Sequence, residues 1–242
     1  MFTKINSYLL YPVILIYMTF LKGMKKDYKK FFLDKKEENK NDDILQLRSK
    51  DGEFFSFVDY FFDKTLPFYK KVLITFEIDL NKAPEEKKFF KYNFYYALRF
   101  IYAASIISKR TSNDNIYVSL ECEKKKKLYD DQINHLIRYH LIAYGTGRVD
   151  KLYFDKESLK DQRSQLAYNT MLSYLDDAKL INFSDQKHLF VLTIEKDNKK
   201  YDIVWSSGDD IELTDFNDVY DKYGNLMKKD IKISNSPIYA SH

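Results

Sequence analysis

Two acidic residues, Glu121 and Glu123, stand at the end of a short apolar run with one residue between them. Residues i and i+2 of a β-strand point to the same face, so the two carboxyl groups would lie about 7 Å apart if the strand continued through both. Carboxyl groups at such a distance can separate each other's pKa values, as paired-carboxylate catalysis requires. Because Lys124 to Lys127 follow directly, the pair also fits a solvated strand end with locally compensated charge.

Four strand-like runs alternate with four helix-like segments in the middle of the chain. Strand alternating with helix predicts parallel βαβ units, so we expect an α/β domain over residues 44–180, either a partial (β/α) barrel or an open parallel sheet. Gly145 and Gly147 are typical stop signals for the third helix. The expected strands are Ile44–Leu47, Lys71–Ile78, Ile116–Leu120 and Val149–Phe154, and the expected helices are Phe54–Tyr69, Phe89–Lys109, Asp130–Tyr144 and Ser164–Ala178.

The pattern changes near Ala178, where helical periodicity gives way to closely spaced turn signals. Short aromatic or β-branched runs bounded by such signals are typical of an antiparallel sheet. We expect a small antiparallel β domain, a β-sandwich-like unit, over residues 181–242. Its four expected strands are Phe190–Glu195, Lys200–Ser207, Asp218–Asn225 and Ile231–Tyr239.

Three landmarks of this C-terminal stretch resemble the β domain that closes many glycoside hydrolases of the (β/α)8 barrel clan. They are Val204-Trp205-Ser206, Asp221-Lys-Tyr-Gly224-Asn225 and Pro237-Ile238-Tyr239. The resemblance covers about residues 116–239, which would match the last barrel units and the β domain in a shortened, degenerate form. It implies that Ile116–Leu120 matches the seventh barrel strand and that the nucleophile position falls at Glu121.

The same resemblance predicts that catalysis is lost. The clan's acid/base carboxylate follows an asparagine at the end of the fourth strand, and this sequence contains no Asn-Glu dipeptide. Glu121 and Glu123 on one strand cannot flank a sugar from both sides. Other carboxylates at expected strand ends are Glu77, Asp79 and Asp155.

We therefore predict a non-catalytic structural or interaction subunit derived from a glycoside hydrolase-like fold, in effect a pseudoenzyme. One alternative is an active glycoside hydrolase with an unusual carboxylate pair that includes Glu121 or Glu123. Another is a membrane-anchored accessory subunit of a larger assembly, unrelated to sugar chemistry. Half a barrel leaves an unpaired sheet edge, which predicts a protein partner or a homodimer that covers it. Carbohydrate is the ligand class that the resemblance implies.

Residues 1–33 form an N-terminal segment whose most apolar part, Ile5 to Leu21, allows two interpretations. It is a signal anchor or membrane segment behind Lys4, or it contains a buried strand from Val13 to Phe20. An anchor would make the protein membrane-associated or secretory, and otherwise we expect it to be soluble. Residues 34–43 carry mixed charge without an apolar side chain and are expected to be a linker.

Composition argues against several other classes of protein. Forty basic and 36 acidic residues give a net charge of only +4, which does not favour nucleic acid as a partner. The single Cys122 excludes an internal disulfide, and His135 and His140 lack the i, i+4 spacing of a helical metal site. We predict no metal and no cofactor. Trp205 lies in an apolar run and is expected in the core rather than on a sugar-binding surface.

Overall fold

The computed structural model describes residues 31–34, 44–49, 71–85 and 116–242, the last with short gaps at 148, 187, 209, 213–215 and 229–230. The apolar segment 5–21 and the expected helices Phe54–Tyr69 and Phe89–Lys109 lie outside the described residues. Among helices in the described ranges, none combines the length and apolar character needed to cross a bilayer.

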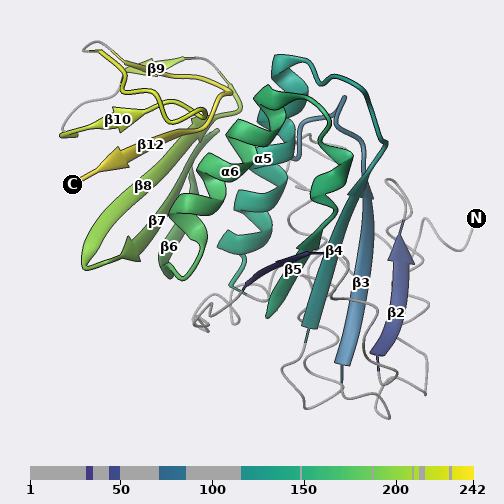
Figure 1. Ribbon diagram of the computed structural model, residues 1–242. Coiled ribbons are helices and arrows are strands. Elements are labelled where there is room, and N and C mark those ends of the chain that lie inside the picture. The colour runs from purple at the N-terminus through teal and green to yellow at the C-terminus, as the bar shows by residue number, and fades with distance from the viewer. Residues whose placement is uncertain are drawn as a thin grey trace, which may run out of the picture.

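A five-stranded sheet in which every neighbouring pair is parallel forms the first half of the fold (Figure 1). The prediction of an α/β unit with four parallel strands is confirmed. These strands are β2 (Ile44–Ser49), β3 (Lys71–Ile78), β4 (Ile116–Cys122) and β5 (Lys151–Phe154). β3, β4 and β5 consist mainly of β-branched, aromatic and leucine side chains, as expected for strands covered on both faces.

The fifth strand, β1 (Phe32–Asp34), is absent from the predicted set. It occupies the end of the predicted N-terminal segment and the first residue of the predicted linker. β1 lies beside β5, the last strand of this sheet, with Leu33 opposite Tyr153. The sheet order is β1-β5-β4-β3-β2, so the two strands that come first in the sequence lie at opposite edges.

Two α-helices follow the last strands of the parallel sheet. Helix α5 (Asp130–Gly145) confirms the predicted third helix, and Gly147, with φ of 62°, ends the segment in the left-handed conformation that glycine adopts most readily. After β5, a short 3₁₀ turn η2 (Lys156–Ser158) leads to α6 (Gln162–Leu175). Asp161 caps α6 by accepting a hydrogen bond from the Ser164 N–H at 2.9 Å.

The C-terminal part is an antiparallel β domain, as predicted. Its main sheet has the order β10-β12-β8-β7-β6, and a separate pair joins β9 and β11. The strands are β6 (Lys179–Gln186), β7 (Leu189–Lys196), β8 (Lys199–Ser206), β9 (Ile211–Glu212), β10 (Val219–Tyr220), β11 (Lys232–Ile233) and β12 (Ile238–Ser241).

Three details of this domain differ from the sequence prediction. β6 is an additional strand, and only the first residues of Asp218–Asn225 are extended before the chain turns. The expected strand Ile231–Tyr239 is divided into β11 and β12, which belong to different sheets. Pro237 lies between the two, where its missing N–H cannot join a ladder of backbone hydrogen bonds.

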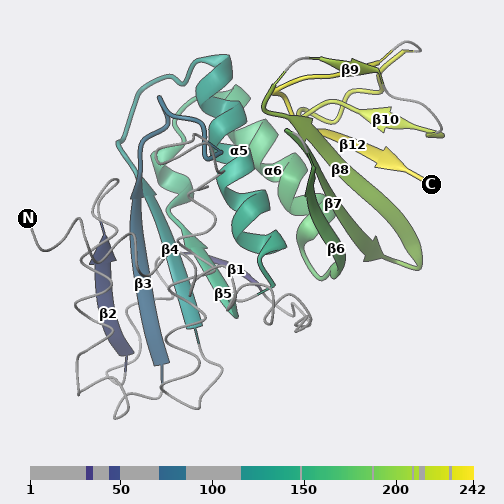
Figure 2. The same cartoon turned by 180° about the vertical axis from the view of Figure 1, so that it is seen from behind.

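The two helices lie between the two sheets, as both views show (Figures 1 and 2). One continuous core joins the three layers. It contains Phe76 and Leu120 from the parallel sheet, Ile137 from α5, Met171 from α6 and Trp205 from the β domain. Helix α5 is therefore buried around most of its circumference, and this position explains why so few of its residues reach solvent.

Candidate functional site

Glu77 and Glu121 are register partners on β3 and β4. They belong to a series of paired positions, Leu73 with Tyr117 and Thr75 with Ser119, which alternate with residues that pack on the helices. All six side chains therefore project from the face of the sheet opposite α5 and α6. We call this set the carboxylate face.

Polarity along the carboxylate face increases toward the carboxyl ends of the strands. Leu73, Tyr117 and Tyr153 form a small buried apolar cluster at its base. Above it, Ser119 is fully buried and its Oγ has no hydrogen-bond partner among the residues that the structure describes. Glu121 follows on the same strand and is only half-buried. Active sites of barrel enzymes lie at this end of the strands, which makes the Glu77–Glu121 edge the candidate functional site.

Glu123 does not join Glu121 on a shared strand. β4 ends at Cys122, so Glu123 lies beyond the ladder. Its side chain is 82% exposed and faces Lys125 at 4.0 Å. The structure thus places Glu123 in the locally compensated, solvated setting that the following lysines suggested, while Glu121 lies beside Glu77.

The other carboxylates expected at strand ends take part in local turns. Asp79 accepts hydrogen bonds from the backbone and side chain of Asn81 and pairs with Lys82 at 3.1 Å. Burial acts to raise the pKa of Asp79, but these partners outweigh it and hold the pKa below its usual value. Asp155 accepts a hydrogen bond from the Glu157 N–H at 3.1 Å and pairs with Lys124 at 3.3 Å.

No metal centre is evident within the described residues, where no group of three or more His, Cys, Asp or Glu side chains converges. His135 and His140 have separate backbone partners. The Nδ1 of His135 lies 2.7 Å from the Leu80 carbonyl oxygen, and that of His140 lies 2.8 Å from the Leu136 carbonyl oxygen. Each imidazole is thus oriented by the backbone.

Trp205 is a core residue, as predicted from its apolar strand. Its ring is fully buried and stacks on Phe190 with a centroid distance of 5.1 Å. Its indole N–H donates to the Glu85 carboxylate at 2.7 Å. A fully buried ring that stacks on another ring, with its polar atom bonded to protein, is not a sugar platform.

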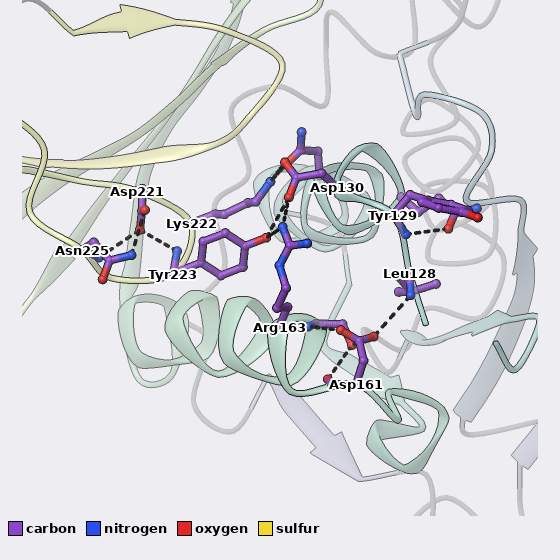
Figure 3. Close-up of polar contacts among 12 residues, drawn as sticks. Leu128, Tyr129, Asp130, Asp161, Arg163, Asp221, Lys222, Tyr223 and Asn225 are labelled. Atoms are coloured by element: carbon purple, nitrogen blue, oxygen red, sulfur yellow. Dashed lines mark hydrogen bonds and ion pairs between the residues drawn. The ribbon is translucent and has the colours of Figure 1, made fainter. Parts of the chain in front are cut away.

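The Asp221-to-Asn225 landmark forms a turn that reaches the helices (Figure 3). Asp221 accepts hydrogen bonds from the N–H groups of Tyr223 and Asn225 at 2.8 and 2.9 Å, and Gly224 has φ of 83°. This turn presents Lys222 and Tyr223 to the start of α5. The landmark that carried the sequence resemblance is therefore a contact between the β domain and the α/β unit.

Comparisons with protein-family models and with curated protein sequences give no match. Several solved structures are similar, among them the three that follow. A family 39 glycoside hydrolase from the gut symbiont Bacteroides cellulosilyticus WH2 superposes with a TM-score of 0.59 at 13% identity, over 76% of this chain and 46% of that protein. A family 30 endoxylanase from Clostridium papyrosolvens C71 gives 0.46 at 8% identity, over 75% and 51% of the two chains. A family 51 arabinofuranosidase from Xanthomonas axonopodis pv. citri gives 0.45 at 7% identity, over 82% and 57%.

The resemblance to the glycoside hydrolase fold is confirmed by the first of these similarities. The chain spans about half the length of the solved proteins that it matches. At such low identity the likeness concerns the fold, because one fold supports many activities.

Proposed function

We propose that this chain is a non-catalytic structural or interaction subunit built on a glycoside hydrolase-like fold. The observation that carries the proposal is the strand order of the parallel sheet. β1 pairs with β5, whereas β2, which follows β1 in the sequence, lies at the opposite edge.

A closed (β/α)8 barrel pairs its last strand with its first, which is the relationship of β5 to β1. In that correspondence β1 is the first barrel strand, and β2 to β5 are the fifth to eighth. Only the nine residues 35–43 separate β1 from β2. One parallel crossover needs a dozen or more residues, so this interval is too short for the second, third and fourth barrel units. The fourth strand is the one whose end bears the acid/base in the resembling clan.

The position of the two carboxylates supports the same proposal. Glu77 and Glu121 extend from one face of neighbouring strands, so they would approach a bound sugar from one side. A glycosidase pair must lie on opposite sides of the scissile bond, where one group protonates the leaving oxygen and the other acts at the anomeric carbon. Among the described residues, Glu121 lies at the position that the resemblance gives to the nucleophile, and Glu77 lies on the same face rather than opposite it.

Covalent trapping tests this proposal at Glu121. The full chain is incubated with 2-deoxy-2-fluoro glycosyl fluorides of several sugars, and its intact mass is measured. We expect no adduct, because the partial barrel that bears Glu121 does not position the anomeric carbon of a sugar for attack. A stoichiometric adduct that maps to Glu121 and disappears in Glu121→Gln would overturn the proposal.

One observation favours the alternative of an active hydrolase. Neighbouring strands are about 4.8 Å apart, which is close to the roughly 5 to 5.5 Å between the carboxyl groups of retaining glycosidases. Glu77 and Glu121 are direct register partners and thus have about this backbone separation. Turnover that requires both residues would support the alternative, with Glu121 as the nucleophile that the label identifies and Glu77 as the acid/base.

We also propose a protein partner, or a second copy of the chain, at the edges of the parallel sheet. Within the described strands, β1 and β2 form those edges. An edge strand offers backbone groups to another chain. Sedimentation velocity of the purified chain at micromolar concentration tests this arrangement. A defined dimer supports self-association, and a stable, soluble monomer contradicts a requirement for any cover.

A further inference from the structure

A stripe of three polar residues runs along one side of helix α5, which is mostly buried. Asp130, Asn134 and Arg138 follow one another at intervals of four, so each lies one turn beyond the last. Asn134 and Arg138 are buried, although polar side chains of this size are rarely buried without partners. Each of the three is engaged by a residue from a distant part of the chain. We call these residues the α5 stripe.

The first end of the stripe holds the β domain through Lys222 (Figure 3). The Lys222 ammonium donates to Asp130 Oδ2 at 2.6 Å and to Asn134 Oδ1 at 2.5 Å. Lys222 is only 3% exposed, so this ammonium group has exchanged water for these two oxygens. Tyr223 donates to Asp130 Oδ1 at 2.9 Å, and Arg163 of α6 binds the same oxygen.

The middle of the stripe contacts the segment between β11 and β12. Asn134 Nδ2 donates to Asn235 Oδ1 at 3.2 Å, and Asn235 Nδ2 donates to Asp131 at 3.2 Å. Asn134 thus bonds to two separate loops of the β domain with its two amide atoms. This fixes the position of those loops along the helix and not merely their distance from it.

The last residue of the stripe, Arg138, is linked through Glu85 to both the parallel sheet and the β domain. Arg138 pairs with Glu85 at 3.4 Å, and both side chains are almost fully buried. Glu85 comes from the loop that follows β3, at the carboxyl end of the parallel sheet. The other oxygen of the Glu85 carboxylate accepts the Trp205 N–H from β8. One buried carboxylate therefore connects the β3 loop, α5 and the β domain.

We infer that the α5 stripe fixes the β domain at one position along α5 and couples it to the loop after β3. The buried cations explain why the docking is selective. Sliding the β domain by one helical turn would move Lys222 away from Asp130 and the Trp205 N–H away from Glu85, leaving buried charge and a buried donor without partners. Apolar contacts alone would tolerate such a shift better, since they lack direction. This inference goes beyond the proposed function and does not depend on it.

The single tryptophan of the chain reports on the far end of the stripe. The test uses the full chain with Lys222→Met, which keeps the aliphatic stem but removes the charge. Lys232→Met is the matched control, because Lys232 lies exposed on β11 of the same domain. Acrylamide quenching of Trp205 and hydrogen exchange of the β3 loop and β8 are measured below the unfolding temperature.

In Lys222→Met we expect the opened population to rise by on the order of tenfold to a hundredfold, the equivalent of one lost charged hydrogen bond. Quenching of Trp205 and exchange at residues 79–85 and 199–206 should then increase together, whereas Lys232→Met should match the wild type. If Lys222→Met proves too unstable, Tyr223→Phe removes the hydrogen bond that Tyr223 donates to Asp130 and the one that it accepts from Arg163, and should give a smaller change in the same regions. Changes confined to residues near the Asp221 turn, with Trp205 and the β3 loop unaffected, would overturn the inference.

Discussion

Glu77 and Glu121 lie side by side at the carboxyl ends of β3 and β4, on the face of the parallel sheet that points away from the helices. Like charges on directly neighbouring strand positions repel each other. This repulsion acts against the stability of the fold, and its size can be measured.

A double-mutant cycle at these two positions measures that repulsion. We expect Glu77→Gln and Glu121→Gln each to relieve it, so that the double variant gains less unfolding free energy than the two single variants together. The coupling should be about 0.2 to 1 kcal/mol, as for other cross-strand pairs. Chemical denaturation of the four proteins at neutral pH gives this value. Strict additivity would mean that the two carboxylates do not sense each other.

His140 should make the protein lose stability as the pH falls from about 6.5 to about 4. Burial lowers the pKa of His140 to about 4 in the folded state, although its hydrogen bond to the Leu136 carbonyl opposes this shift. The unfolded chain binds this proton near pH 6.5, so protonation favours unfolding across that window and the full benefit of the neutral ring is present only above it.

The expected loss is about 3 kcal/mol between the two ends of the window. The pH dependence of unfolding free energy is compared with that of His140→Phe, which keeps an aromatic ring among Phe32, Phe154 and Tyr168. The variant should lack the loss between pH 6.5 and 4. Parallel curves for the two proteins would show that His140 is not the responsible group.

Glu85→Gln should be among the most destabilising single changes in the described part of the chain. It retains an oxygen for Trp205 but leaves the Arg138 guanidinium buried without a counter-charge. The expected cost is about 3 to 5 kcal/mol of unfolding free energy. Glu123→Gln, at an exposed position, is the control and should change stability by less than about 0.5 kcal/mol.

A second substitution distinguishes charge from packing at this site. In Glu85→Gln with Arg138→Met the unpaired buried charge is removed, so we expect part of the lost stability to return. If the double variant were less stable than the sum of the two single changes predicts, the buried pair would contribute through shape and not through charge balance.

Gly224→Ala should destabilise the β domain through the backbone alone. A Cβ at Gly224 would meet Thr170 no closer than 3.6 Å, which is an ordinary contact, but φ of 83° is unfavourable for alanine. We expect a loss of about 1 to 2 kcal/mol. Gly224→Asn should lose less, since asparagine tolerates left-handed conformations better. Thermal unfolding monitored by circular dichroism compares the three proteins.

Long, uniformly patterned elements are the parts of this fold that local sequence predicts. β3, β4 and α5 can be recognised because each has enough β-branched or periodically spaced apolar residues for its pattern to differ clearly from that of the neighbouring sequence. β1, with three residues, and β9 and β11, with two each, are too short to show a period. Their formation depends on the partner strand that tertiary structure supplies.

The sequence predicts only part of the candidate site, for a related reason. The sequence gives the spacing of Glu121 and Glu123 within one run, but the pairing of Glu121 with Glu77 depends on the register between strands that are 44 positions apart. The α5 stripe did have a local signal. Asp130, Asn134 and Arg138 recur every fourth residue, so they share one side of a helix that is mostly buried, a pattern that indicates a polar contact on a buried face.

The measurement that tests the central claim most directly is turnover of a panel of aryl glycosides by the full chain, with Glu121→Gln and Glu77→Gln alongside. We predict the same background rate for all three proteins, because no residue that the structure describes is placed as a general acid opposite Glu121, and proton transfer alone contributes roughly 10²- to 10⁴-fold to such reactions. Hydrolysis by the wild type that Glu121→Gln abolishes, in a variant with unchanged circular dichroism, would contradict the account.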